Sequence, residues 1–187
     1  MRDSVDVRRR VLIGVLAAVM ACAGPSVAFA ASKADLNSSS KAKLDTLIAR
    51  VPAAKALYGK AVAVLVFPSI TKAGLVVGGQ YGEGVLWRGG KPVAYYNTAG
   101  ASYGLQAGAQ TFGYAMFFMR ESALKALDAA NGFEVGVGPS VVVMDEGMAK
   151  TATTTTMNKD VYAFIFSQQG LMAGIGLQGN KITKLDK

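Results

Sequence analysis

The sequence contains no histidine, and Cys22 is the only cysteine among its 187 residues. Without histidine, a Ser-His-Asp triad cannot form. A transition-metal site built from histidines or from several cysteines is excluded for the same reason. A single cysteine also excludes a disulfide bond within the chain. We expect a protein that is not an enzyme and that needs neither a metal nor another cofactor.

Two motifs match catalytic or cofactor-binding sequences, but their context does not support those roles. Residues 100–104 match the G-x-S-x-G nucleophile elbow around Ser102, yet that elbow needs a histidine base and a helix after the serine. A hydrolase that uses Ser102 with a lysine is therefore the weakest functional hypothesis. Residues 174–179 match G-x-G-x-x-G, but a dinucleotide site requires a following helix and only eight residues remain. We expect these glycines to shape a strand.

The N-terminal region predicts export. Residues 8–10 are arginines, an eleven-residue apolar run follows at 11–21, and residues 28–30 (AFA) have the small-x-small pattern of a cleavage site. The prediction is a signal peptide over 1–30 and a single domain over 31–187, located in the periplasm or at an envelope membrane. Alternatively, residues 19–22 resemble a bacterial lipobox, the signal ends at residue 21 and Cys22 is lipidated. Export by either route argues against nucleic acid as a partner.

Positive charge is unevenly distributed along the chain, whose net charge is +8. Residues 31–72 hold seven basic and two acidic residues, whereas residues 73–187 hold nine basic and eight acidic ones. The excess therefore lies in the segment before the glycine-rich part of the sequence. Trp87, Arg88 and Lys91 combine an aromatic ring with two cations, a mixture found at membrane interfaces and in ordinary surface turns.

Residues 33–58 are predicted to be helical, with Asn37 and Ser38 to Ser40 as candidate caps and a break at Pro52. Leu44, Leu47, Ile48 and Val51 recur at the spacing of one helix face. Two interpretations of this stripe remain open. It packs on the protein core with the lysines in water, or it lies on a membrane surface.

Glycines interrupt the strand-forming residues of the segment 74–87, which predicts a curved β element with a bend near Gly78 and Gly79. A Gly-Leu-x-x-Gly unit occurs at 74–78, 104–108 and 170–174, as expected for a recurring corner in a closed or nearly closed sheet. Further predicted elements are a turn between strands at 88–91, a helix at 121–130 and a hairpin that joins strands 161–166 and 171–177. The fold class is α+β: a glycine-rich, strongly curved antiparallel sheet, barrel-like or a sandwich, with two or three helices, one or two of them N-terminal.

Four segments together resemble a known family. Residues 58–61 (YGKA), 64–79 (VLVFPSITKAGLVVGG), 102–108 (SYGLQAG) and 170–179 (GLMAGIGLQG) resemble the bacterial branch of the SYLF domain family, also called Ysc84-like and formerly DUF500. The resemblance covers about residues 40–185 and implies a lipid-binding module without catalytic residues. Eukaryotic relatives bind phosphoinositides and membranes, and some bind actin. Lys55, Lys60 and Lys72 match the basic N-terminal part of the family.

The first functional hypothesis is thus a non-enzymatic module that binds anionic phospholipid membranes outside the cytoplasm. The alternative is a structural or assembly protein of the envelope that binds protein partners. The candidate lipid-binding residues are Lys41, Lys43, Leu44, Leu47, Ile48, Arg50, Lys55, Lys60, Lys72, Trp87, Arg88 and Lys91.

Overall fold

The computed structural model describes residues 32–74, 77–103, 108–128, 132–134, 140–144, 159–170 and 180–187. The elements, in chain order, are α2 Lys33–Arg50, α3 Pro52–Tyr58, β1 Ala63–Gly74, β2 Val77–Arg88, β3 Lys91–Tyr103, β4 Gly108–Phe118, α4 Glu121–Leu127, β5 Phe133–Glu134, β6 Val141–Met144, β7 Val161–Gly170 and β8 Lys181–Leu185. Within these ranges, no helix has the length and apolar character needed to cross a membrane. The predicted signal peptide and Cys22 lie outside the described residues.

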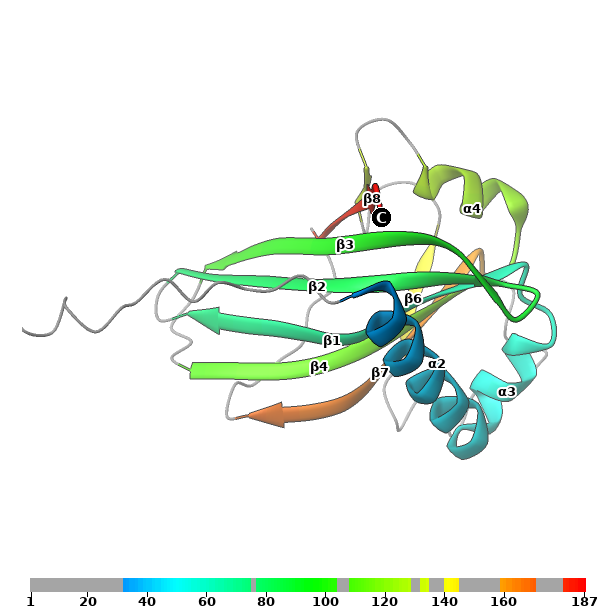
Figure 1. Cartoon of the computed structure of the whole chain (residues 1–187), viewed down its shortest axis with the longest axis horizontal. Helices are drawn as coiled ribbons and strands as arrows, with labels where there is room; N and C mark the ends of the chain where they lie inside the picture. Colours follow the sequence, from blue (N-terminus) through cyan, green and yellow to red (C-terminus); the bar gives the residue numbers. More distant parts are fainter. Residues whose placement is uncertain are drawn as a thin grey trace, which may run out of the picture. The chain divides into compact units, whose positions relative to one another are not determined.

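Eight strands form one strongly curved sheet in the order β5-β8-β3-β2-β1-β4-β7-β6 (Figure 1). The predicted α+β fold with a curved sheet is therefore confirmed. The sheet is mixed rather than purely antiparallel, because β6 and β7 pair in parallel. A parallel pair needs a long crossover connection, and the sixteen residues 145–160 between these strands supply that length.

The central strand β1 bends at Pro68 and Ser69, where its register shifts against both β2 and β4. Proline has no N–H for the ladder, so inside a sheet it is tolerated at a bulge of this kind. The predicted curved element at 74–87 is thus wrong in its bounds. Gly74 ends β1 and pairs across the hairpin with Gly78 of β2, and the bulge in β1 lies upstream of the predicted bend.

The helices cover the sheet on its two faces. α2 and α3 pack their buried leucines and alanines against Val64, Val85 and Phe117 on one face. α4 packs on the opposite face with Leu65 and Phe118. Because side chains alternate along each strand, both faces bury apolar residues at the end of the sheet that carries the helices.

The start of α2 differs from the prediction. Ser32 is the N-cap, and its Oγ accepts a hydrogen bond from the backbone N–H of Asp35 at 3.1 Å. Asn37 and Ser38 to Ser40 lie inside the helix and are not caps, because the helix begins one turn earlier. The predicted break is confirmed: Pro52 begins α3, where a missing N–H costs no intrahelical bond.

The predicted hairpin around residues 167–170 is also wrong. These residues continue β7, and Gln169 pairs with Thr111 of β4. The residues that suggest a turn form a bulge instead. The register of β7 against β4 shifts between Thr111 and Gly113, and Ser167 has a φ of 53°. Residues 171–177 lie outside the described part of the chain.

The Gly-Leu-x-x-Gly units mark one end of the sheet. Gly74 pairs with both Gly78 and Gly108, and Gly170 pairs with Gln110 of the same strand β4. Gly74 of the first unit and Gly108 of the second therefore lie side by side on neighbouring strands. This end of β1 and β4 projects beyond α2 (Figure 1).

A polar contact joins α4 to β3 and β8. Tyr96 Oη and Lys184 Nζ both donate to Asp128 Oδ1, at 2.8 and 3.0 Å. Partial burial raises the pKa of the Asp128 carboxyl, but the two donors and the charge of Lys184 outweigh it, and the pKa is lowered overall.

We expect this contact to make the domain less stable in acid. A carboxyl whose pKa is lower in the folded state stabilises the fold above its unfolded pKa of about 3.9, and that stability is lost as pH falls through the folded pKa. Asp128→Asn is therefore expected to lower the melting temperature at neutral pH. Below that, the melting temperature of the variant should fall less steeply with decreasing pH than that of the parent. Melting curves followed by circular dichroism between about pH 2 and pH 6 measure this. If the melting temperatures of the parent and the variant fall in parallel as the pH is lowered, this expectation is wrong.

Candidate functional site

An open groove of about 400 Å³ runs between the C-terminal half of α2 and the bulged part of β7. Leu47, Val51 and Phe166 give it an apolar floor, and Lys43 and Arg50 stand at its rim. Thr46 and Ser167 complete the lining. The groove thus combines two cations with an apolar surface.

The two cations are held in different ways. Lys43 Nζ donates a hydrogen bond to Ser167 Oγ at 3.0 Å, which ties α2 to β7 across the groove. Ser167 occupies the left-handed backbone region, a conformation that a serine adopts only when its surroundings enforce it. Arg50 lies in the last turn of α2 and is exposed, and no ion pair within the described ranges includes it. Its guanidinium is therefore available to an anion.

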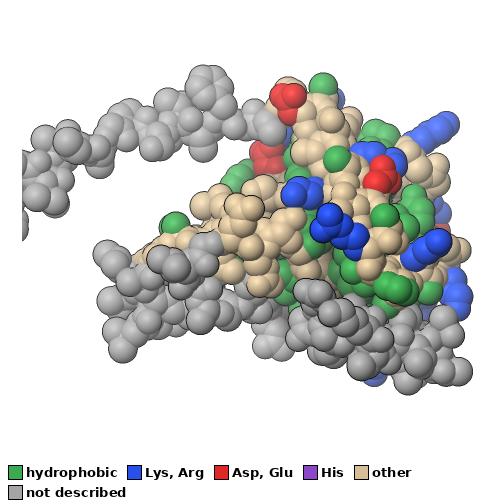
Figure 2. All heavy atoms as spheres, turned by 90° about the horizontal axis from the view of Figure 1, so that it is seen from below, with side chains coloured by type: hydrophobic (Ala, Val, Ile, Leu, Met, Phe, Trp, Pro, Cys, Tyr) green, Lys and Arg blue, Asp and Glu red, His purple; other side chains and the backbone are tan. Residues whose placement is uncertain are grey.

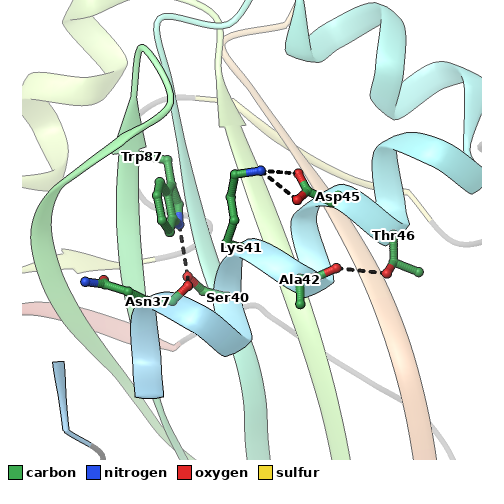
Figure 3. A network of polar contacts seen from close by, with 7 residues as sticks. All are labelled: Asn37, Ser40, Lys41, Ala42, Asp45, Thr46 and Trp87. Atoms are coloured by element: carbon green, nitrogen blue, oxygen red, sulfur yellow. Dashed lines mark hydrogen bonds and ion pairs between the residues drawn. The ribbon is translucent and has the colours of Figure 1, made fainter. Parts of the chain in front are cut away.

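Neighbouring polar groups on α2 are already engaged (Figure 3). Lys41 Nζ contacts both carboxylate oxygens of Asp45, at 2.5 and 2.6 Å. Thr46 Oγ1 donates to the carbonyl oxygen of Ala42 at 2.8 Å. The charge of Lys41 is thus largely balanced within its own helix, in contrast to that of Arg50.

Trp87 is buried and does not form a membrane-facing cluster with Arg88 and Lys91. Its indole Nε1 donates to Ser40 Oγ at 3.0 Å, beneath α2 (Figure 3). A tryptophan at an alternating strand position faces the core if its neighbours i±2 do, and Val85 is fully buried. Arg88 forms an ion pair with Glu121 at the start of α4, and Lys91 lies exposed beside the turn at Gly89 and Gly90.

The structure separates the other predicted residues into three groups. Leu44 and Leu47 are buried and Ile48 is partly buried against the sheet, which confirms that the stripe packs on the core. Lys55 and Lys60 are exposed on α3 and just after it. Lys72 is only 6% exposed and lies on the opposite face of the sheet from α2.

Sequence reasoning missed Phe166 and Ser167, although they form one wall of the groove. Their contact with α2 spans more than a hundred residues of sequence, as the Lys43–Ser167 hydrogen bond shows. The local signal, a change from apolar to polar residues after Phe166, predicts a hairpin turn instead. Only the pairing of β7 with β4 places these residues beside α2.

No group of three or more aspartate, glutamate, histidine or cysteine side chains within the described segments is arranged to hold a metal ion. The groove, in contrast, has side chains that can contact an anion and an apolar chain together.

The curved sheet, the helical pair and the basic, apolar groove define an α+β domain with the features of a binding module. Residues 99–187 match the Ysc84 family model, described as Las17-binding protein actin regulator. The resemblance to this family noted from the sequence is therefore confirmed over residues 99–187. The family is one of binding domains. The matched range includes Phe166 and Ser167 but not α2. A search of curated proteins found no match.

Proposed function

We propose that the protein is a non-enzymatic module that binds phospholipids at an anionic membrane surface. The observation that carries this proposal is the groove between α2 and β7, in which Lys43 and Arg50 stand beside the apolar floor. A phospholipid presents the same combination, a phosphate next to an apolar chain. The match of residues 99–187 to a family of binding domains supports the proposal.

The chemistry of the rim suits a phosphate. A guanidinium donates two parallel hydrogen bonds to phosphate oxygens, and an ammonium acts as a compact point charge beside it. Lys43 already donates to a neutral hydroxyl, so it can transfer that bond to a charged acceptor, which binds it more strongly. Leu47, Val51 and Phe166 offer contact to the first methylene groups of an acyl chain.

Further basic residues are exposed on the helical part of the domain. Seen from below the view of Figure 1, lysine and arginine side chains lie among hydrophobic ones over the part of the domain that carries the helices (Figure 2). Lys55 and Lys60 are exposed there and add long-range attraction to an anionic surface. This charge pattern supports membrane recruitment before a lipid enters the groove.

The membrane is proposed to lie outside the cytoplasm, because residues 1–30 have the pattern of a secretory signal. The intact mass of the protein from its native host tests this. An N-terminus at Ala31 supports simple cleavage, and a lipid-modified Cys22 supports a lipoprotein. Retention of residues 1–21 in the mature protein contradicts both routes.

Flotation with vesicles tests membrane binding directly. The protein is expected to float with anionic phosphatidylglycerol vesicles and to remain at the bottom with neutral phosphatidylcholine vesicles. Because salt screens exposed charges within about 10 Å at 0.1 M, flotation should fall steeply as the salt concentration rises. Equal flotation with both lipids refutes the electrostatic mechanism. Absence of flotation with either lipid favours the second candidate, binding of a protein partner, as in the description of the family as Las17-binding.

A further inference from the structure

Four polar side chains, three of them buried and one half-buried, form a row on the face of the sheet opposite α2. Lys72 of β1 pairs directly with Gln80 of β2 and with Gln110 of β4. Asn180 lies over Gly100 of β3, the cross-strand partner of Gln80. A Cβ placed on Gly100 would lie 2.1 Å from Asn180 Oδ1, so this glycine makes room for the asparagine. The row therefore crosses four neighbouring strands.

The side chains of this row lack partners among the described residues. Lys72, Gln110 and Asn180 are only 6%, 5% and 4% exposed. Gln80 Nε2, Gln110 Oε1 and Asn180 Nδ2 are buried without a hydrogen-bond partner, and no ion pair within the described ranges includes Lys72. Three of the four unsatisfied buried side-chain atoms found in these ranges thus belong to one row.

Such a cluster is unfavourable unless something satisfies it. A buried polar group without a hydrogen bond destabilises a fold, and a buried charge without a counter-charge does so much more. Core packing does not require these residues, because Ile70 and Phe112 fill the same face of β1 and β4 directly beside them. The concentration of unsatisfied groups in one place therefore points to a ligand rather than to packing.

We propose that this row binds a phosphate group that carries a hydroxylated substituent, as in glycerol phosphate. Lys72 Nζ, Gln80 Nε2 and Asn180 Nδ2 are donors on one face of the sheet, on or over adjacent strands, and phosphate oxygens can accept from all three. Gln110 Oε1 is an acceptor, so it needs a donor that a fully ionised oxyanion lacks and that a hydroxyl supplies. The site lies on the opposite face of the sheet from the groove and is independent of the function proposed for the groove.

The test compares the full chain with Lys72→Met by calorimetry and by thermal melting, with glycerol 3-phosphate and with inorganic phosphate as probes. Methionine keeps the length of the side chain and removes its charge. The parent is expected to bind glycerol 3-phosphate about tenfold more tightly than inorganic phosphate, and Lys72→Met is expected to lose at least about tenfold in affinity. Melting curves without ligand show whether Lys72→Met folds as the parent does.

Lys125→Met is the matched control, since Lys125 is an exposed lysine of α4 and is not one of the residues of the row. It should bind both probes like the parent. Gln80→Leu, which removes one neutral donor, gives a second measurement if Lys72→Met does not fold. It is expected to weaken glycerol 3-phosphate binding by about fivefold to tenfold.

Vesicles of phosphatidylglycerol distinguish a free ligand from a lipid headgroup. Binding of soluble glycerol 3-phosphate that depends on Lys72 assigns the site to a free phosphate ester. Dependence on Lys72 that is seen with vesicles alone assigns it to the lipid headgroup. Unchanged affinity of Lys72→Met for every probe overturns the proposal, and so does the absence of binding or of a thermal shift in the parent with all three.

Discussion

Gly84→Val is expected to destabilise the domain by about 3 kcal/mol and to lower its melting temperature by about 10 °C. Gly84 lies in β2, where a Cβ would come within 2.7 Å of the Phe67 ring and 2.8 Å of the Val66 carbonyl oxygen. Phe67 is fully buried in the centre of the sheet and cannot move aside without disturbing Tyr114, whose ring centroid is 4.8 Å away. The added side chain therefore forces the central strands apart.

Gly79→Val, five residues earlier on the same strand, is the matched control. The nearest atom to a Cβ at Gly79 is the Gly100 carbonyl oxygen at 3.8 Å, an ordinary contact. Gly79 is exposed, and valine favours strand conformation, so this variant should melt close to the parent or slightly above it. Denaturation by urea and by heat measures both variants. Equal melting temperatures for Gly84→Val and Gly79→Val contradict the close approach of Phe67 to β2.

The helices and the tight turn of this fold could be predicted because their signals are local. The leucine stripe of α2, the break at Pro52 and the turn at Gly89 and Gly90 depend on residues within one or two turns of chain. Both turn glycines have a positive φ, 57° and 76°, as a two-residue hairpin turn requires. The close approach of β1 to Gly82 and Gly84 could not be predicted in this way, because it depends on the pairing of β1 with β2.

The site was harder to predict because its parts come together only through sheet pairing. Lys43 and Arg50 were identified from charge alone, and the same criterion also selected Lys41 and Lys72. The structure separates them: Lys41 is paired with Asp45, and Lys72 is buried on the other face. Composition records how many cations a segment has, whereas the pairing partners and the face of the strand decide which of them can meet a ligand. Trp87 illustrates the same point, since its strand register and Ser40 place it under α2.

The two proposed sites, on opposite faces of the sheet, differ in their exposure to solvent. The groove lies at the surface, and its cations remain hydrated until an anion binds, so the energy of each contact is modest and sensitive to salt. The row around Lys72 is buried, so a bound phosphate there is poorly screened and its contacts are stronger. Membrane recruitment is thus expected to depend on salt much more than occupancy of the buried row does.

The double variant Lys43→Glu with Arg50→Glu is expected to weaken binding to phosphatidylglycerol vesicles by about a hundredfold at low salt. Each basic residue near an anionic surface contributes about 1 kcal/mol, and reversal replaces attraction by repulsion, so two reversals remove about 3 kcal/mol after partial screening. Both residues line the same groove, and neither is in the buried core, so the fold should persist. Sedimentation or flotation across a series of lipid concentrations measures the partition coefficient.

The control for this variant carries the same change of net charge elsewhere. Lys125→Glu with Lys159→Glu reverses two exposed lysines that do not line the groove. If attraction depends on the total charge of the protein, the two double variants weaken binding equally, and the groove has no special role. If the groove receives the phosphate, the Lys43 and Arg50 variant binds at least tenfold more weakly than the control at low salt. The difference should narrow as salt screens the surface charges, while the apolar contacts of Leu47 and Phe166 persist.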